Sequence, residues 1–127
     1  MTGNITALRP KERVKLDAEP IVAIYRDLGT TAAEQVVTRA LSEVALTLAG
    51  IAEQVRQHDM ADLQRNLRRL QRMAEHLGMV SLGTISAELR LCIERGDATA
   101  FAAVWARMMR IAERSLATDK DLLDRKL

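Results

Sequence analysis

The strongest constraint on the fold is an apolar seam of helical period that runs through residues 31–57. Its members recur at alternating spacings of four and three residues: Val37, Leu41, Val44, Leu48, Ile51 and Val55. Side chains with this spacing lie along one side of an α-helix, and that side must be covered by another element. Thr31 and Glu34 precede the seam with the spacing of a capping box, which marks the start of a helix. The segment therefore predicts a long helix that packs against others.

Further segments show the same period, and each ends at a recognisable stop. Asp59 and Asp97 stand where a helix would need an N-cap. Gly78 and Gly96 stand where a helix would end in the left-handed conformation. The expected helices cover about residues 21–28, 31–57, 60–77, 81–95 and 98–117. Since no stretch alternates with period two for long enough, no strand is predicted.

The composition favours a single helical domain. The chain has 127 residues and only three aromatic side chains, so its core must be aliphatic, which suits packed helices. Short links between helices of similar length favour antiparallel neighbours. We therefore expect an all-α, antiparallel up-down-up-down four-helix bundle over residues 21–117, with a short extra N-terminal helix. Residues 1–20, which hold both prolines, are expected to form a flexible arm, and residues 118–127 a charged tail.

Several classes of function are disfavoured by what the sequence contains. The formal net charge is only +2, which gives no global field of the kind that nucleic-acid binders use. No phosphate-binding, dinucleotide-binding or hydrolase motif occurs, so no enzyme activity, catalytic residue or cofactor is expected. His58, His76 and Cys92 are too scattered for a metal site. No continuous apolar run reaches the length of a membrane span or a signal peptide, so we expect a cytoplasmic protein without membrane contact.

A strip of basic side chains is expected on the 60–77 helix, on the side that faces away from its apolar seam. The seam consists of Met60, Leu63, Leu67, Leu70, Ala74 and Leu77. At about 100° per residue, five basic side chains fall within an arc of about 100° on the opposite side. They are Arg65, Arg68, Arg69, Arg72 and His76, and we call them the basic strip. A strip of nearly one sign predicts an acidic partner, and the alternative interpretation is an ordinary solvated helix face.

The segment 67–78 resembles the motif of histidine phosphotransfer (HPt) domains, roughly A-H-x-L-K-G-x-A-x-x-L-G. Its framework positions are matched by Leu70, Ala74, Leu77 and Gly78. The three positions that carry the chemistry differ: Arg68 replaces the histidine, Gln71 the lysine and Arg72 the small glycine. The resemblance extends over about residues 31–117 through the pattern of helices.

The resemblance implies a signalling role without phosphotransfer. In HPt domains an exposed histidine takes a phosphoryl group from the aspartate of a receiver domain. Arg68 cannot do so, because a guanidinium stays protonated and has no nucleophilic lone pair. A guanidinium can still pair with the acidic pocket of a receiver. The expected function is therefore that of an HPt-like pseudo-phosphotransferase, which docks a response-regulator receiver or another two-component phosphorelay protein. The expected contacts are Arg65, Arg68, Arg69, Gln71, Arg72 and His76.

Three alternatives remain open at the level of the sequence. The first is a self-associating structural helical bundle, because the helices over 21–28 and 98–117 have wide apolar surfaces that would suit a homodimer. The second is a weak nucleic-acid-binding module that uses the arginines of the basic strip. The third is active phosphotransfer through His76, eight residues beyond Arg68 on the same strip.

Overall fold

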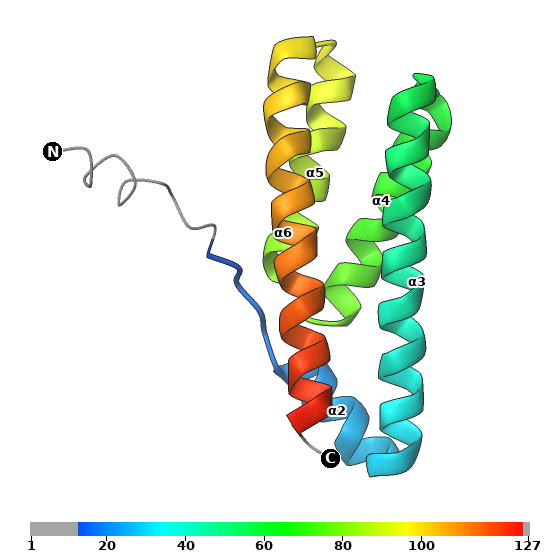
Figure 1. Cartoon of the computed structure of the whole chain (residues 1–127), viewed down its shortest axis with the longest axis vertical. Helices are drawn as coiled ribbons and strands as arrows, with labels where there is room; N and C mark the ends of the chain where they lie inside the picture. The colour runs from blue at the N-terminus through cyan, green and yellow to red at the C-terminus, as the bar shows by residue number, and fades with distance from the viewer. Residues whose placement is uncertain (1–12, 126–127) are drawn as a thin grey trace, which may run out of the picture.

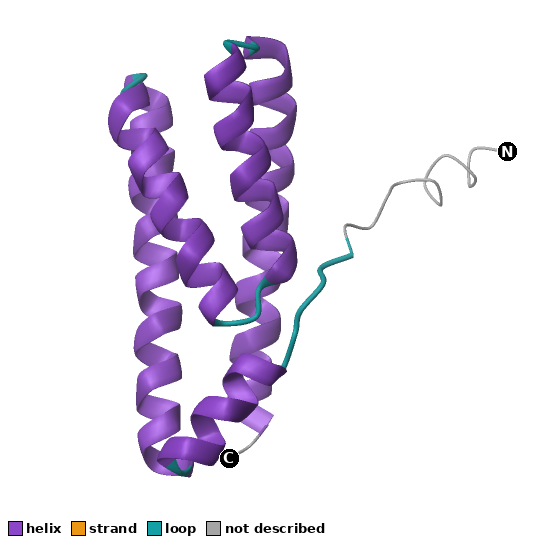
Figure 2. Cartoon of the chain, turned by 180° about the vertical axis from the view of Figure 1, so that it is seen from behind, coloured by secondary structure: helices purple, strands orange, loops and turns teal. Residues whose placement is uncertain are grey.

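The computed structural model describes residues 13–125, and side chains as far as residue 119. Within that range the chain is helical and contains no strand (Figures 1 and 2), which confirms the all-α prediction. The helices are α2 (Glu19–Leu28), α3 (Thr30–Gln57), α4 (Met60–His76), α5 (Val80–Arg95) and α6 (Ala98–Arg125).

The helices form two antiparallel hairpins that stand side by side (Figure 1). One hairpin is α3 with α4, the other is α5 with α6, and α4 and α5 pack closely against each other between them. The short helix α2 packs on α3 at the end of the molecule where α6 also ends (Figure 1). Contact between α3 and α6 is slight, so the two outermost long helices hardly close on each other.

The core lies where the predicted seams meet. It comprises Val37, Leu41, Val44, Leu48, Ile51, Leu63, Leu67, Leu70, Ala74, Leu77, Met79, Leu82, Ile85, Leu89, Met108, Ile111 and Ala112. Other apolar side chains are less buried: Phe101, Val104 and Trp105 pack on the core but remain half-buried, and Met60, an expected member of the α4 seam, is exposed. They lie toward the ends of their helices, where fewer neighbours surround them.

Two expectations about helix ends were wrong. The capping box at Thr31 does not form, because α3 begins at Thr30 behind Gly29 and no side chain caps it. Thr31 thus lies inside the first turn. The last helix was expected to end at about residue 117, before a charged tail, whereas α6 continues to Arg125. The inner side of α6 stays in contact beyond residue 117, where Asp119 is buried in spite of the charged sequence around it.

The expected N-terminal arm is in part an ordered strap. Asp17 donates its backbone N–H to the carbonyl oxygen of Gly78 at 2.7 Å. The backbone N–H of Lys15 donates to Ser81 Oγ at 2.7 Å, and Ser81 returns a backbone bond to Lys15 at 3.2 Å. Residues 13–18 therefore bind the turn between α4 and α5 and the first turn of α5, which is incompatible with a flexible arm there. Residues 1–12 of the expected arm and 126–127 of the expected tail lie outside the described residues.

By length and composition, α3 is apolar enough to cross a membrane, with a mean hydropathy of 1.2 over its most apolar window. A helix at the core of a soluble protein passes the same test, and six α3 side chains are buried here within the fold.

Candidate functional site

The basic strip occupies the outer side of α4. Leu63, Leu67, Leu70 and Ala74 are fully buried on the inner side of this helix, which turns the opposite side to solvent. All five members of the basic strip are exposed: Arg65, Arg68, Arg69, Arg72 and His76. The start of α4 is held by Asp59, whose carboxylate accepts from the backbone N–H of Asp62 at 3.3 Å. The sequence therefore placed these side chains correctly relative to the core.

Most of the basic strip has no acidic partner. Arg65 forms an ion pair with Asp62, one turn before it on α4. Among the described residues, Arg68, Arg69 and Arg72 make no ion pair or side-chain hydrogen bond, and neither does His76. An ordinary solvated face would interleave acidic side chains with these cations. The surface therefore presents several unneutralised charges in a row.

Gln71, expected among the partner-binding residues, faces another way. It is half-buried at the interface of α4 with α5, where its Oε1 accepts from Arg90 Nη1 at 3.0 Å. Gln64, two turns earlier, donates through Nε2 to the backbone carbonyl of Arg90 at 3.4 Å. Gln71 thus fastens α5 to α4, and the structure separates it from the basic strip.

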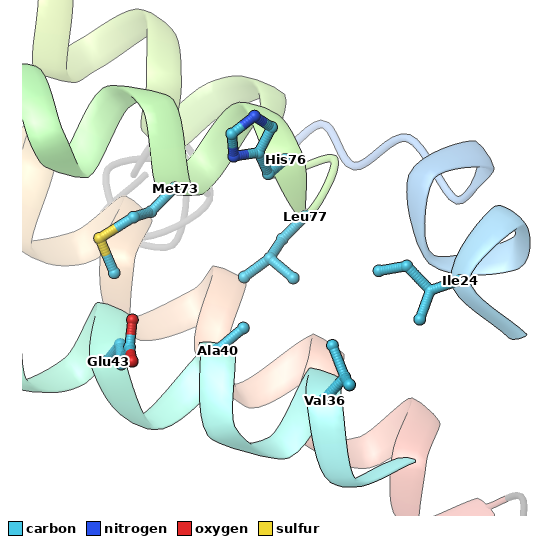
Figure 3. Close-up of a pocket in the computed structure, with 7 residues that line it drawn as sticks. All are labelled: Ile24, Val36, Ala40, Glu43, Met73, His76 and Leu77. Atoms are coloured by element: carbon cyan, nitrogen blue, oxygen red, sulfur yellow. The ribbon is translucent and has the colours of Figure 1, made fainter. Parts of the chain in front are cut away.

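Two hollows open along the seam between α3 and α4, beside the basic strip. The first has a volume of about 240 Å³ and lies between α2, α3 and the end of α4. It is lined by Ile24, Val36, Ala40, Glu43, Met73, His76 and Leu77 (Figure 3). Leu77 points into it from just after the end of α4, while Val36 and Ala40 point toward Leu77 from α3 (Figure 3). Its interior is therefore mostly apolar, with Glu43 and His76 as its ionisable members.

The second hollow continues along the same seam, with a volume of about 300 Å³. It is lined by Glu43, Leu46, Thr47, Gly50, Asn66 and Arg69. Since Glu43 lines both hollows, they are neighbours, and we call them together the α3–α4 furrow. Arg69 and His76 belong both to this furrow and to the basic strip. A surface that combines one apolar recess, one more polar recess and adjacent cations is suited to binding a partner of mixed character.

Large apolar side chains stand unusually exposed on the α3 side of the furrow. Leu46 is 72% exposed and Val36 is 45% exposed. Sequence reasoning did not single them out, although a signal was present, since both fall outside the heptad seam of α3. What the sequence alone did not indicate is that this side of α3 faces the basic strip across a recess.

Contacts across the furrow fix its shape. Asn66 of α4 donates through Nδ2 to Gln54 Oε1 of α3 at 3.0 Å. Thr47 of α3 donates to Met73 Sδ of α4 at 3.8 Å. These bonds connect the same two helices that carry the exposed apolar side chains and the cations. The two rims of the furrow are therefore joined by side-chain contacts as well as by the turn between α3 and α4.

The other buried polar groups lie away from this surface. Asp119 and Ser115, one turn apart on α6, are 4% and 0% exposed, and Asp119 Oδ2 and Ser115 Oγ have no hydrogen-bond partner among the described residues. Burial raises the pKa of Asp119 from 3.8 to about 6. Within the described residues no group of three or more His, Cys, Asp or Glu side chains is arranged to hold a metal ion.

No protein-family model, curated protein or solved structure matches the chain significantly.

Proposed function

We propose that this protein is a non-catalytic, HPt-like signalling module that docks a response-regulator receiver, or a related phosphorelay partner, through the basic strip. The observation that carries the proposal is the row of exposed cations on α4. Arg68, Arg69 and Arg72 have no acidic partner among the described residues, although α4 is well packed on its inner side. Receivers carry an acidic pocket, and guanidinium groups pair with carboxylates through two parallel hydrogen bonds.

The proposal includes the finer architecture. We infer that α3 to α6 correspond to the antiparallel up-down-up-down bundle of HPt domains, with α2 as the extra N-terminal helix. The short turns and the close packing of each consecutive pair from α3 to α6 support this inference. The slight contact between α3 and α6 is where the chain departs from a closed bundle.

Arg68 is central to the proposal that the protein is non-catalytic. In the proposed alignment it takes the position of the phosphoacceptor histidine, and it is exposed on α4 in the middle of the basic strip. A guanidinium there offers charge without a nucleophile. The protein would then hold a receiver without drawing its phosphoryl group, and would act in the cytoplasm as a sequestering partner or as a competitor of a true phosphotransferase.

The test is to mix the protein with phosphorylated and unphosphorylated receivers from the same organism and to measure binding by calorimetry. We expect micromolar binding of at least one receiver, weakened at least tenfold by Arg68→Gln with Arg72→Gln. The matched control is Arg13→Gln with Arg95→Gln, which removes the same charge from exposed positions off α4. Absence of binding to every receiver, or an equal loss in the control, would contradict receiver docking.

Label transfer separates docking from catalysis. A receiver charged with radiolabelled acetyl phosphate should leave no label on the protein. Label on His76 would overturn the non-catalytic proposal, since that histidine is exposed on the same strip. Gain of label by the triple variant Arg68→His, Gln71→Lys and Arg72→Gly would support the alignment with the HPt motif.

A further inference from the structure

The α3–α4 furrow adds a recognition element that charge alone does not supply. We propose that it seats an amphipathic helix of the partner protein, with apolar side chains entering the furrow and an acidic flank lying on the basic strip. This inference rests on the proposed function, because it specifies which chemistry the docked partner presents. It concerns the same surface of α4 together with the neighbouring side of α3.

The apolar half of the interaction follows from the shape of the furrow. Val36 and Leu46 are ten residues apart on α3, which corresponds to about 15 Å along a helix axis. Between them lies the apolar hollow, into which Leu77 points (Figure 3). A partner helix of about three turns spans that length and presents apolar side chains at i, i+3, i+7 and i+10. An amphipathic helix therefore matches the length of the furrow between Val36 and Leu46.

The charged half follows from the order of cations along α4. Arg69, Arg72 and His76 are separated by three and four residues, so they form a row along one side of the furrow. A helix lying alongside α4 would place acidic side chains opposite them at the same spacing. Since these arginines have no acidic partner among the described residues, pairing with a ligand would break no existing ion pair.

Glu43 gives the furrow a direction. It lies on α3 and lines both hollows, opposite the cations of α4. A carboxylate of the partner placed over Glu43 would be repelled, whereas the same group over Arg69 would be attracted. The acidic flank must therefore lie on the α4 side of the furrow, and the apolar side chains on the α3 side. This asymmetry distinguishes the correct orientation of a partner helix from its reverse.

Two other classes of ligand fit the surface less well. A nucleic acid would use the arginines but would leave exposed Leu46 and the apolar hollow without contacts. A membrane surface would contact exposed Leu46 but would leave the apolar hollow between α2, α3 and α4 without contacts. An acidic amphipathic helix uses the recess, the exposed apolar side chains and the cations together.

The probe for the test is a fluorescein-labelled synthetic helix of 18 residues. It carries leucines at i, i+3, i+7 and i+10, and glutamates along one flank. Fluorescence anisotropy with the full chain should give saturable binding that weakens as salt concentration rises. A peptide of the same composition in scrambled order should bind at least tenfold more weakly. Equal binding of both peptides, or no binding of either, would overturn the proposal.

Variants assign the binding to the furrow. Leu46→Gln changes a side chain that is 72% exposed, so the fold should be retained, and peptide affinity should fall at least fivefold. The matched control is Leu91→Gln on α5, whose side chain is 41% exposed, and it should leave affinity unchanged. Arg69→Gln with Arg72→Gln should weaken binding at least tenfold and flatten its salt dependence. If Leu46→Gln and Leu91→Gln change peptide affinity equally, the furrow is not the binding site.

The same variants separate this proposal from receiver docking. Receiver binding that is lost with Arg68→Gln and Arg72→Gln but is unchanged by Leu46→Gln would retain receiver docking and reject the furrow. Parallel titrations use a 20-base-pair DNA duplex and vesicles of phosphatidylcholine with phosphatidylglycerol. If the DNA or the vesicles bind more tightly than the peptide, and the arginine variants abolish that binding, the ligand of this surface is the nucleic acid or the membrane and not an amphipathic helix.

Discussion

Gln71 and Arg90 form a polar contact between α4 and α5 in which a half-buried guanidinium meets a neutral amide, with Nη1 to Oε1 at 3.0 Å. No carboxylate pairs with Arg90 among the described residues. A lysine at position 71 would remove the acceptor and bring a second cation against the guanidinium. We expect Gln71→Lys to lower the free energy of unfolding by roughly 1–3 kcal/mol, measured by urea denaturation.

The control for this change is Gln35→Lys, which alters the same chemistry at an exposed position of α3. A similar loss of stability in both variants would show that the contact with Arg90 has little energetic weight. The expected difference also affects reconstruction of an HPt motif. A lysine at position 71 is expected to destabilise the α4–α5 interface. For the label-transfer test, the double variant Arg68→His with Arg72→Gly should therefore fold better than the triple variant.

At the scale of the elements, Gly78 has two roles at the end of α4. Its φ of 73° is favourable only for glycine, and a Cβ there would overlap the carbonyl group of Asp17 in the N-terminal strap. Gly96 ends α5 with a φ of 64° but has open space around it. Replacing either glycine with alanine destabilises the protein by about 1 kcal/mol, because alanine disfavours the left-handed conformation.

We therefore expect Gly78→Ala to destabilise the protein by roughly 1–3 kcal/mol more than Gly96→Ala, because only the first also displaces the strap. Thermal or urea unfolding of the two variants gives the difference. Hydrogen exchange adds a local readout, since the amide of Asp17 should lose protection in Gly78→Ala and keep it in Gly96→Ala. Retained protection in both would mean that the strap tolerates the side chain.

At the scale of the whole molecule, Asp119 makes stability depend on pH. Its folded-state pKa of about 6 lies above the ordinary value of 3.8, so the folded protein binds this proton more tightly than the unfolded chain. The resulting stabilisation is complete below about pH 4 and is lost as the pH rises through 6. With allowance for partial solvation of the group, this amounts to roughly 1–3 kcal/mol.

Asp119→Asn should therefore remove part of the pH dependence. As the pH rises from 4 to 7, the free energy of unfolding of the variant should increase by roughly 1–3 kcal/mol relative to that of the natural chain. Urea denaturation at each pH measures this difference. Glu113→Gln, an exposed position on the same helix, is the control and should run parallel to the natural chain. Identical profiles for all three proteins would show that folding does not raise the pKa of Asp119.

The sequence by itself determined the helices, their inner sides and the outward basic strip. Residues of one helix face recur with a fixed period, so Val37 and Leu67 were placed in the core, and Arg68 opposite it, before any tertiary information. Helix ends were less determined, as the absent capping box at Thr31 and the long α6 show. An end depends on contacts beyond the local sequence, as the burial of Asp119 beyond the expected end of the last helix shows.

Only the tertiary structure decided which helices face each other and what lies beside the basic strip. Helical period gives the direction of a side chain from its own axis, but not which neighbour it meets. It therefore left Gln71 among the docking residues, whereas packing of α5 turned it toward Arg90. The α3–α4 furrow, with Leu46 and Val36 on one rim and Arg69 on the other, arises where the two helices of one hairpin pack against each other. Such a recess belongs to neither helix alone.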